Sequence, residues 1–271
     1  MDSKELARKV RIDAVRMVHK HHASHIASAL SVVDILAVLY SNIMHYDPQN
    51  PNLQNRDRLV LSKGHAGVAI YATLAETGFI ALDELEKYYS DGSIYSGHVS
   101  HKGVPGVELS TGSLGHGICV AVGMACAAKK AKNTHRIYAI IGDGECDEGS
   151  VWETALFARH YHLNNLTVIV DHNKMQAMGT CEAVMDLGDL AEKWRAFGWH
   201  VISVEDGNNH EQLKLALQTV DTELPICIIA NTVKGCGVSF MENNLLWHYR
   251  DPQEDAYIQA MKELGAEDIY A

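Results

Sequence analysis

Residues 137–149 read IYAIIGDGECDEG, in which five apolar residues end in GDG at positions 142–144 and a helical pattern follows. A second apolar run, LTVIV at residues 166–170, ends in DHN at positions 171–173. Short apolar strands that alternate with helices are typical of a parallel sheet covered on both faces. Because ligands bind beyond the carboxyl ends of such strands, the residues after each run are the first candidates for a functional site.

Runs of strand length and runs with helical spacing alternate through the rest of the chain. The alternation predicts strands at residues 137–141, 166–170, 200–204 and 226–230. Helical spacing predicts helices at residues 6–18, 31–44, 65–76, 81–89, 116–132, 151–161, 187–197, 211–220 and 253–264. We therefore expect an α/β fold with a parallel sheet flanked by helices. It forms a single domain over residues 1–271, with a helical N-terminal part at about 1–110 and an α/β core at about 111–271.

Composition excludes several classes of function. The 271 residues carry a formal net charge of −11, from 23 Lys and Arg against 34 Asp and Glu. An acidic surface repels phosphate backbones and anionic lipids, so neither nucleic acid nor membrane is expected as a partner. No apolar stretch approaches the ~20 residues of a membrane helix, and the N-terminus, MDSKELARKVR, does not read as a signal peptide. None of the six cysteines forms a C-x-x-C pair, which favours reduced thiols and a cytoplasmic location.

The polar residues after the first two predicted strands suit a divalent cation. Neighbouring parallel strands would place Asp143 and Asn173 side by side at one edge of the sheet. A carboxylate, an amide oxygen and a main-chain carbonyl are hard ligands for Mg²⁺ or Ca²⁺, and they leave coordination positions for water and phosphate oxygens. Gly142 and Gly144 allow a phosphate to approach the backbone, and the following helix N-terminus favours an anion. The pattern predicts a site for a metal ion and a phosphate group.

Other motifs fit this part of the sequence less well. An EF-hand fails because Glu148 stands where the loop needs glycine, and Thr154 stands where it needs a bidentate glutamate. A Walker A loop is absent, and GCG at residues 235–237 lacks the third glycine of a dinucleotide fingerprint. A lone GDG is a common turn, but the strand before it, the helix after it and the DHN segment favour a ligand site.

The GDG motif with a downstream D-x-N is the thiamine diphosphate motif, and nearly all of the chain resembles the N-terminal half of a transketolase. Seven segments carry the resemblance in family order: SHIAS at 24–28, DRLVLSKGHA at 57–66, SGH at 96–98, PGVE at 105–108, TGSLGHG at 111–117, TVKG at 232–235 and WH at 247–248. The resemblance implies the thiamine-diphosphate-binding fold, with thiamine diphosphate and Mg²⁺ (or Ca²⁺) as cofactors.

The resemblance also implies roles for individual residues. The metal ligands would be Asp143, Asn173 and the carbonyl of Met175. The contacts to thiamine diphosphate would be Ser28, His65, Gly112, Ser113, Leu114, Gly144, Asn173, Lys234 and His248. The catalytic histidines, which handle substrate hydroxyl protons, would be His25, His98 and His248. Glu148 and Glu153 would link two cofactor sites across a dimer interface.

Several other histidines have no assigned chemistry. His19, His21 and His22 could suggest a metal cluster, but a helix end whose dipole suits a cationic imidazole is the simpler interpretation. His101 and His116 fall near the predicted site without a role. The family usually has Gln at the position of His116 and proline at the positions of residues 26 and 99, and these departures concern the substrate more than the cofactor.

In the resembled family, activation of the cofactor depends on a glutamate of a second α/β domain, which this chain of 271 residues does not hold. We therefore expect a natural subunit rather than a fragment, with a partner subunit that carries the pyrimidine-binding domain, in an α2β2 heterotetramer. The assembly would transfer a two-carbon ketol unit from a ketose, phosphorylated or modified, to an aldose acceptor. The alternatives are a component of another thiamine diphosphate enzyme, such as a 2-oxo acid decarboxylating one, and a non-catalytic cofactor-binding assembly partner.

Overall fold

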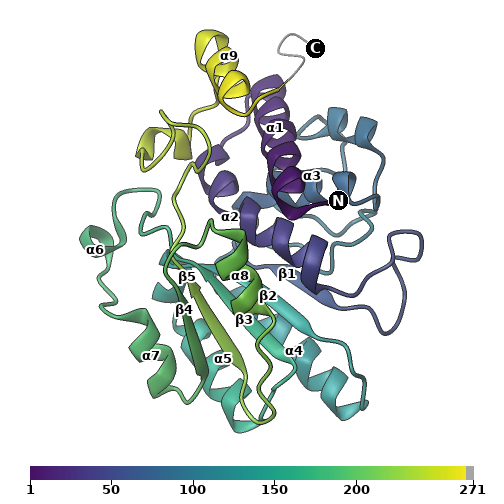
Figure 1. Ribbon diagram of the computed structural model, residues 1–271, viewed down its shortest axis with the longest axis vertical. Helices are drawn as coiled ribbons and strands as arrows, with labels where there is room; N and C mark the ends of the chain where they lie inside the picture. Colours follow the sequence, from purple (N-terminus) through teal and green to yellow (C-terminus); the bar gives the residue numbers. More distant parts are fainter. Residues whose placement is uncertain (267–271) are drawn as a thin grey trace.

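A parallel five-stranded sheet forms the centre of the molecule in the computed structural model, which describes residues 1–266 (Figure 1). The strands are β1 (Arg58–Leu61), β2 (Ile137–Gly142), β3 (Leu166–Asp171), β4 (His200–Val204) and β5 (Ile226–Ala230), in the spatial order β1-β2-β3-β5-β4. The four predicted strands are confirmed. In the register, Gly142 pairs with Asp171, so the GDG and DHN segments leave the sheet side by side, as predicted.

Each central strand buries both faces, because alternate side chains enter two separate hydrophobic clusters. In β2, Tyr138 and Ile140 belong to one cluster, whereas Ala139 and Ile141 belong to the other. The first cluster also contains residues of α1 (Ser3–His21), α2 (Ile26–Val38), α3 (Gly67–Glu76), α8 (His210–Leu217) and α9 (Glu254–Glu263). The second contains residues of α4 (His116–Lys130), α5 (Gly149–His160) and α7 (Leu190–Ala196). The sheet is thus covered by helices on both faces.

Short helical segments complete the described chain. They are η1 (Leu39–Ile43, a π-helical turn), the 3₁₀ segments η2 (Gly64–Ala66), η3 (Leu82–Lys87), η4 (Gly144–Asp147) and η5 (Leu245–His248), and α6 (Cys181–Val184). Because η2 follows β1 and η4 follows β2, both lie at the carboxyl edge of the sheet. The helix predicted at residues 81–89 is only a 3₁₀ segment.

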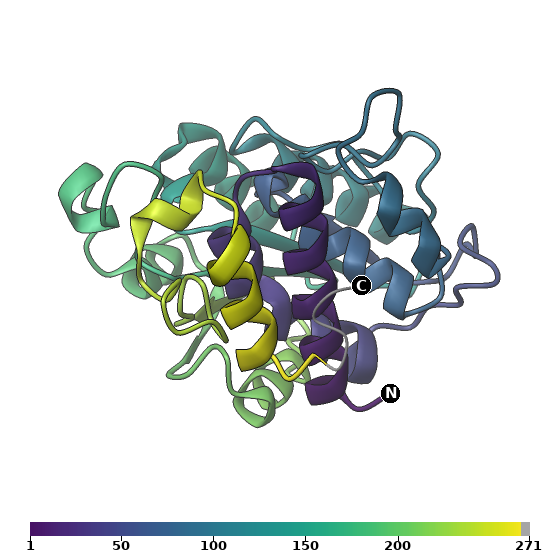
Figure 2. The ribbon, with the colours of Figure 1, turned by 90° about the horizontal axis from the view of Figure 1, so that it is seen from above.

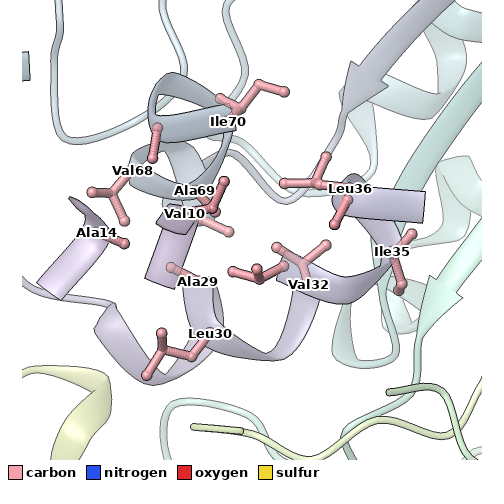
Figure 3. Packing of buried hydrophobic residues seen from close by; sticks show 14 of the residues in the cluster. Val10, Ala14, Ala29, Leu30, Val32, Ile35, Leu36, Val68, Ala69 and Ile70 are labelled. Carbon is pink, nitrogen blue, oxygen red and sulfur yellow. The ribbon is translucent and has the colours of Figure 1, made fainter. Parts of the chain in front are cut away.

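Helix α2 lies inside the protein, and all of its residues are buried. Figure 3 shows Ala29 and Val32 of α2 packed near Val10 of α1 and Ala69 of α3. The continuous helical stretch Ile26–Ile43 has 18 residues with a hydropathy of 1.8, which is long and apolar enough to cross a membrane. The expectation that no such stretch exists is therefore wrong, although 83% of this stretch is buried within the fold, as in a core helix.

The predicted C-terminal helix is confirmed as α9, which lies beside α1 in Figure 2. His19, in the last turn of α1, stacks on Tyr257 of α9 with ring centroids 3.8 Å apart. His21 ends α1 and His22 caps it, as the helix-end interpretation of these histidines expects. Residues 267–271 lie outside the described part of the chain.

Strand β1 is the one strand of this sheet that the sequence pattern does not predict, because it falls within the part expected to be helical. Its four residues, RLVL, pair with β2 from Arg58↔Ile137 to Leu61↔Ile140. A run this short carries little periodicity of its own, and pairing with a longer neighbour decides its conformation. Its addition brings the segment after residue 61 to the same edge of the sheet as the GDG loop.

Candidate active site

A cavity of about 290 Å³ opens at the carboxyl ends of β2 and β3. This is the edge at which parallel sheets bind their ligands. Segments far apart in the sequence meet there, and the lining comprises His25, Ser28, Lys63, His65, His98, Gly112, Leu114, Gly142, Asp143, Gly144, Glu145, Asn173, Met175, Gln176, Ala177, Met178, Lys234 and His248.

Most residues predicted for the site line this cavity. They are His25, Ser28, His65, His98, Gly112, Leu114, Asp143, Gly144, Asn173, Met175, Lys234 and His248. Three predicted residues, Ser113, Glu148 and Glu153, do not line it and are exposed. Glu148 precedes α5 and Glu153 lies within it, so within one chain neither glutamate reaches the cavity. Their predicted role therefore needs a second copy of the chain.

Two neighbouring loops bring the predicted metal ligands together. Asp143 Oδ1 accepts a hydrogen bond from the Gly144 N–H at 2.8 Å, and its Oδ2 accepts one from the Lys174 N–H at 2.5 Å. The Met175 N–H donates to Asn173 Oδ1 at 3.1 Å. Lys174 has φ +64°, in the left-handed region that non-glycine residues seldom adopt. A strained residue thus stands between the two predicted ligands of this loop.

The charges at this end of the cavity are buried and close to one another. Burial and the nearby Asp171 carboxylate raise the pKa of Asp143 above its usual range. Burial and the Lys63 ammonium lower the pKa of Lys234 to about 8. The Lys234 ammonium donates to the carbonyl of Met175 at 3.1 Å and to that of Gln176 at 3.2 Å. The carbonyl predicted to bind a cation therefore already accepts from a cationic group.

Within residues 1–266, no group of three His, Cys, Asp or Glu side chains is arranged to hold a metal ion. The possible cluster of His19, His21 and His22 is thus not found. The predicted site at the sheet edge is of another kind, because only Asp143 supplies a carboxylate, and its other oxygens come from an amide and a main-chain carbonyl. Such oxygen donors suit Mg²⁺ or Ca²⁺ rather than a transition metal.

Four histidines from four segments lie close together in the lining of the cavity. The His25 ring centroid lies 5.4 Å from that of His65, 5.5 Å from that of His98 and 4.9 Å from that of His248. His25 has φ 72°, again in the left-handed region, and its N–H donates to the His248 carbonyl at 2.7 Å. The backbone strain at His25 is therefore located in the histidine cluster itself.

The pKa values of all four histidines are lowered. Burial and the neighbouring His98 lower the pKa of His25 to about 4, and burial and Lys234 lower the pKa of His248 to about 3. Burial and Lys63 hold the pKa of His65 well below its usual value, and burial lowers that of His98. A neutral imidazole has a free lone pair on one ring nitrogen, which can accept a hydrogen bond from a hydroxyl group.

The lowered pKa values predict a pH dependence of folding stability. Below about pH 6.5 the unfolded chain protonates its histidines, whereas native His65 stays neutral to a much lower pH. The unfolded state then binds more protons, so stability falls as the pH decreases from about 6.5. The melting temperature of the wild-type protein should therefore fall between pH 7 and pH 5. We expect this decrease to be about 2–4 °C smaller in His65→Asn than in the wild-type protein, as measured by thermal unfolding of the cofactor-free chain.

The control for that measurement is His160→Asn, since His160 is exposed and lies on α5. This variant should keep the pH dependence of the wild-type protein. Equal pH dependence in His65→Asn and the wild-type protein would show that the cluster does not resist protonation.

The sequence analysis missed the role of Glu145, which looks like an ordinary turn acid after the GDG motif. Its side chain is buried and accepts from the Gly115 N–H at 2.8 Å, from the Gly142 N–H at 3.1 Å and from the Ser62 hydroxyl. One carboxylate therefore fixes three loops of the cavity wall. Lys63, which the segment at 57–66 contains, also lines the cavity without a predicted role. In both cases the signal was a charged residue next to a strand end.

Comparison with known proteins gives one family for nearly the whole chain. Residues 2–269 match the family described as transketolase, thiamine diphosphate binding domain. One subunit of an apulose-4-phosphate transketolase from Phocaeicola vulgatus is 41% identical over 259 residues, which are 95% of this chain and 92% of that protein. A 6-deoxy-6-sulfo-D-fructose transketolase subunit of Clostridium sp. is 39% identical over 269 residues, 98% of each chain.

A solved structure gives the same result for the fold. The crystal structure of transketolase from Campylobacter jejuni matches with a TM-score of 0.92 and 32% identity, over 99% of this chain. The match covers 43% of the C. jejuni chain. The chain thus spans less than half of that transketolase but nearly the whole of the two subunits.

Proposed function

The chain belongs to the transketolase family and comprises its thiamine diphosphate binding domain, and on that basis we propose that it is one subunit of a two-chain transketolase. The reaction is the transfer of a two-carbon ketol unit from a ketose to an aldose acceptor. The observation that carries the proposal is the match over 92% and 98% of two proteins that are themselves transketolase subunits. Those names do not favour the alternatives of a 2-oxo acid decarboxylating component or a non-catalytic assembly partner.

The cavity residues fit a diphosphate group held by a divalent cation. A Cβ atom at position 144 would lie 2.8 Å from the Gln176 side chain, so only glycine leaves the backbone free at this wall. Asp143, Asn173 and Met175 all line the cavity. These residues would hold Mg²⁺ or Ca²⁺, and Lys234 would stand against the negative charge of the diphosphate.

The histidine cluster would handle the protons of the sugar. Thiamine diphosphate, when bound, supplies the electron sink that lets a carbon–carbon bond beside a carbonyl break. His25 Nδ1 lies 2.9 Å from the Ser24 hydroxyl, and His248 Nδ1 lies 3.4 Å from the Ser28 hydroxyl. Since these contacts engage one nitrogen of each ring, Nε2 is the atom that would exchange a proton with a substrate hydroxyl. His98, on the facing loop, would do the same from the other side.

A partner subunit would complete the active site at the mouth of the cavity. Met178 lines the cavity although it is 76% exposed, and Tyr249, whose ring lies 4.8 Å from that of His248, is 66% exposed. Large apolar side chains at the rim of a polar site are typical of a surface that another protein covers. We place the subunit with the pyrimidine-binding domain there.

A second copy of the chain would pack on the outer face of α4 and α5. Val120 of α4 and Leu156, Phe157 and Tyr161 at and after α5 are all exposed, and the last two rings are 4.4 Å apart. Glu153 is exposed on the same helix. A self-complementary contact here would give the α2β2 assembly, and it would carry Glu148 and Glu153 toward the neighbouring copy.

The substrate class and location follow from the same proposal. The relatives are named for apulose-4-phosphate and for 6-deoxy-6-sulfo-D-fructose, and we propose a ketose that carries a phosphate or a comparable anionic group. The six cysteines are free, and Cys146 and Cys227 are buried, which suits the reducing cytoplasm.

Reconstitution with the partner subunit tests the proposed function. Ketol transfer by the complex should exceed that of the chain alone at least about tenfold, since catalytic groups that act as a unit fail together when some are missing. The assay uses a panel of ketose phosphates and modified ketoses with an aldose acceptor, thiamine diphosphate and Mg²⁺. Sedimentation of the complex gives its mass and checks the α2β2 stoichiometry.

Two outcomes would contradict the proposal. Strong ketol transfer by the chain alone would refute the split active site. Turnover of pyruvate by the complex, without ketol transfer, would favour the 2-oxo acid decarboxylating alternative.

A further inference from the structure

A fully buried carboxylate, Asp171, ends β3 two residues before Asn173. The Lys63 ammonium donates to its Oδ2 at 2.5 Å, and the Ser31 hydroxyl donates to the same oxygen at 2.6 Å. The Thr232 hydroxyl donates to Oδ1. Because Ser31 belongs to α2, Lys63 follows β1 and Thr232 follows β5, this single carboxylate connects three segments to the loop that holds Asn173.

One edge of the Asn173 amide faces this network. Its Nδ2 lies 3.2 Å from Ser31 Oγ and 3.4 Å from Asp171 Oδ2. A serine hydroxyl has one proton to donate. Ser31 Oγ lies 3.1 Å from the Ser28 carbonyl and 2.6 Å from Asp171 Oδ2, and the shorter, charge-assisted hydrogen bond to Asp171 is the stronger one. Ser31 therefore offers only lone pairs to Asn173. Both neighbours of this edge are acceptors, so an NH₂ group fits here and a carbonyl oxygen does not.

The other edge of the same amide faces a donor. The Met175 N–H donates to Asn173 Oδ1 at 3.1 Å. A carbonyl oxygen has two lone pairs, so Oδ1 keeps one for a cation. A reversed amide would set its NH₂ group against the Met175 N–H and its oxygen against the Asp171 carboxylate, leaving these buried groups without partners.

We propose that Asp171 is a positioning residue that fixes the Asn173 amide with Oδ1 toward the cation of the cofactor site. It acts directly, and it also acts through Ser31, whose hydroxyl donates its hydrogen bond to Asp171. This inference rests on the function proposed above, because it concerns the cation which that function requires. Lys63 balances the buried charge of Asp171, and the two side chains are 2% and 0% exposed.

The experiment measures the Mg²⁺ concentration that half-saturates thiamine diphosphate uptake by the two-chain complex, followed by calorimetry. Asp171→Asn replaces the carboxylate by an amide of the same shape, which no longer compels the serine proton or the Asn173 NH₂ group to point toward it. We expect the half-saturating Mg²⁺ concentration to rise about 10–100-fold, as is usual when a group that orients a metal ligand is lost. A value equal to that of the wild-type complex would overturn the proposal.

Exchanging the two side chains separates orientation from support of the fold. In the double variant Asp171→Asn with Asn173→Asp, the ligand at position 173 is a carboxylate, which presents oxygen at both edges and needs no orienting. The new amide at position 171 can donate to it. The exchange should therefore restore most of the Mg²⁺ affinity that Asp171→Asn loses. A double variant that binds Mg²⁺ no better than Asp171→Asn would reduce Asp171 to a structural role and overturn the inference.

A matched pair of hydroxyl deletions covers the case in which Asp171→Asn does not fold, which circular dichroism would reveal. Ser31→Ala and Thr232→Val each remove one hydroxyl that donates to Asp171. Only Ser31 also contacts Asn173. Ser31→Ala should raise the half-saturating Mg²⁺ concentration more than Thr232→Val does. Equal effects of the two deletions would overturn the proposal.

The wild-type complex distinguishes failure of the proposed function from failure of the inference about Asp171. If it takes up no thiamine diphosphate with Mg²⁺, the proposed function itself fails. If the wild-type complex takes up thiamine diphosphate with Mg²⁺, and the Asp171 and Ser31 variants bind Mg²⁺ as well as the wild-type complex does, only the inference about Asp171 fails.

Discussion

Asp143→Ala should weaken Mg²⁺-dependent uptake of thiamine diphosphate by the two-chain complex more than about 100-fold, since loss of groups that merely orient a ligand already costs 10–100-fold. Asp143 is the one carboxylate among the three predicted ligands, and it is 5% exposed. Burial and Asp171 raise its pKa, so a cation that holds the ionised form relieves both effects. Calorimetry with and without Mg²⁺ measures the change in affinity.

The same variant makes a second prediction about thermal stability. A ligand that binds only the native state raises the melting temperature, and Asp143→Ala should lose this increase. Without cofactor its melting temperature should fall by less, because removal of a buried charge offsets part of the loss of the hydrogen bonds from the Gly144 and Lys174 N–H groups. Melting curves with and without cofactor measure both effects.

Asp147→Ala is the matched control, because Asp147 lies in the same loop but outside the cavity lining, where it accepts from Gln176. It should keep cofactor uptake close to that of the wild-type complex. Uptake by Asp143→Ala equal to that of Asp147→Ala would contradict the predicted metal site.

His98→Ala should lower kcat of the reconstituted complex by about 10²–10⁴-fold, the usual contribution of a positioned acid or base. Cofactor uptake should remain, because the predicted metal ligands Asp143, Asn173 and Met175 follow β2 and β3 and lie outside the loop of His98. Burial lowers the pKa of His98, so the neutral base predominates near pH 7 in the wild-type enzyme. Steady-state ketol transfer and calorimetry on the same preparation separate turnover from cofactor binding.

His101→Ala is the control for this loop, since His101 is exposed, contacts Ser110 and does not line the cavity. It should keep kcat near the wild-type value. Unchanged turnover in His98→Ala would support the alternative in which this chain binds cofactor for assembly only.

Local pattern was sufficient to predict four of the five strands and the juxtaposition of the GDG and DHN segments. The run before Gly142 and the run before Asp171 are each apolar at nearly every position, and this requires burial on both faces whatever the rest of the fold does. Because neighbouring parallel strands end at one edge, the juxtaposition of Asp143 and Asn173 followed from their position after each strand.

Local pattern was insufficient where long-range pairing sets the conformation. The strand Arg58–Leu61 is too short to be recognised from its own residues, and it exists because β2 lies beside it. The stretch Ile26–Ile43 is long and apolar enough to cross a membrane, contrary to the expectation from the sequence, and 83% of it is buried in the fold, where α2 packs against α1 and α3. The exposed Glu148 and Glu153 have their predicted role only if another copy of the chain supplies the second half of the contact.

The sequence by itself determined the α/β class, the sheet edge that carries the chemistry and the residues that the transketolase resemblance assigns to it. The tertiary structure alone decided that four histidines from separate segments line one cavity with their rings in contact distance of His25, and that Asp171 links three segments to the loop of Asn173. The reason is physical: the periodicity of a strand or helix depends on neighbouring residues, whereas burial, pKa and the direction of a hydrogen bond depend on groups that only folding brings together.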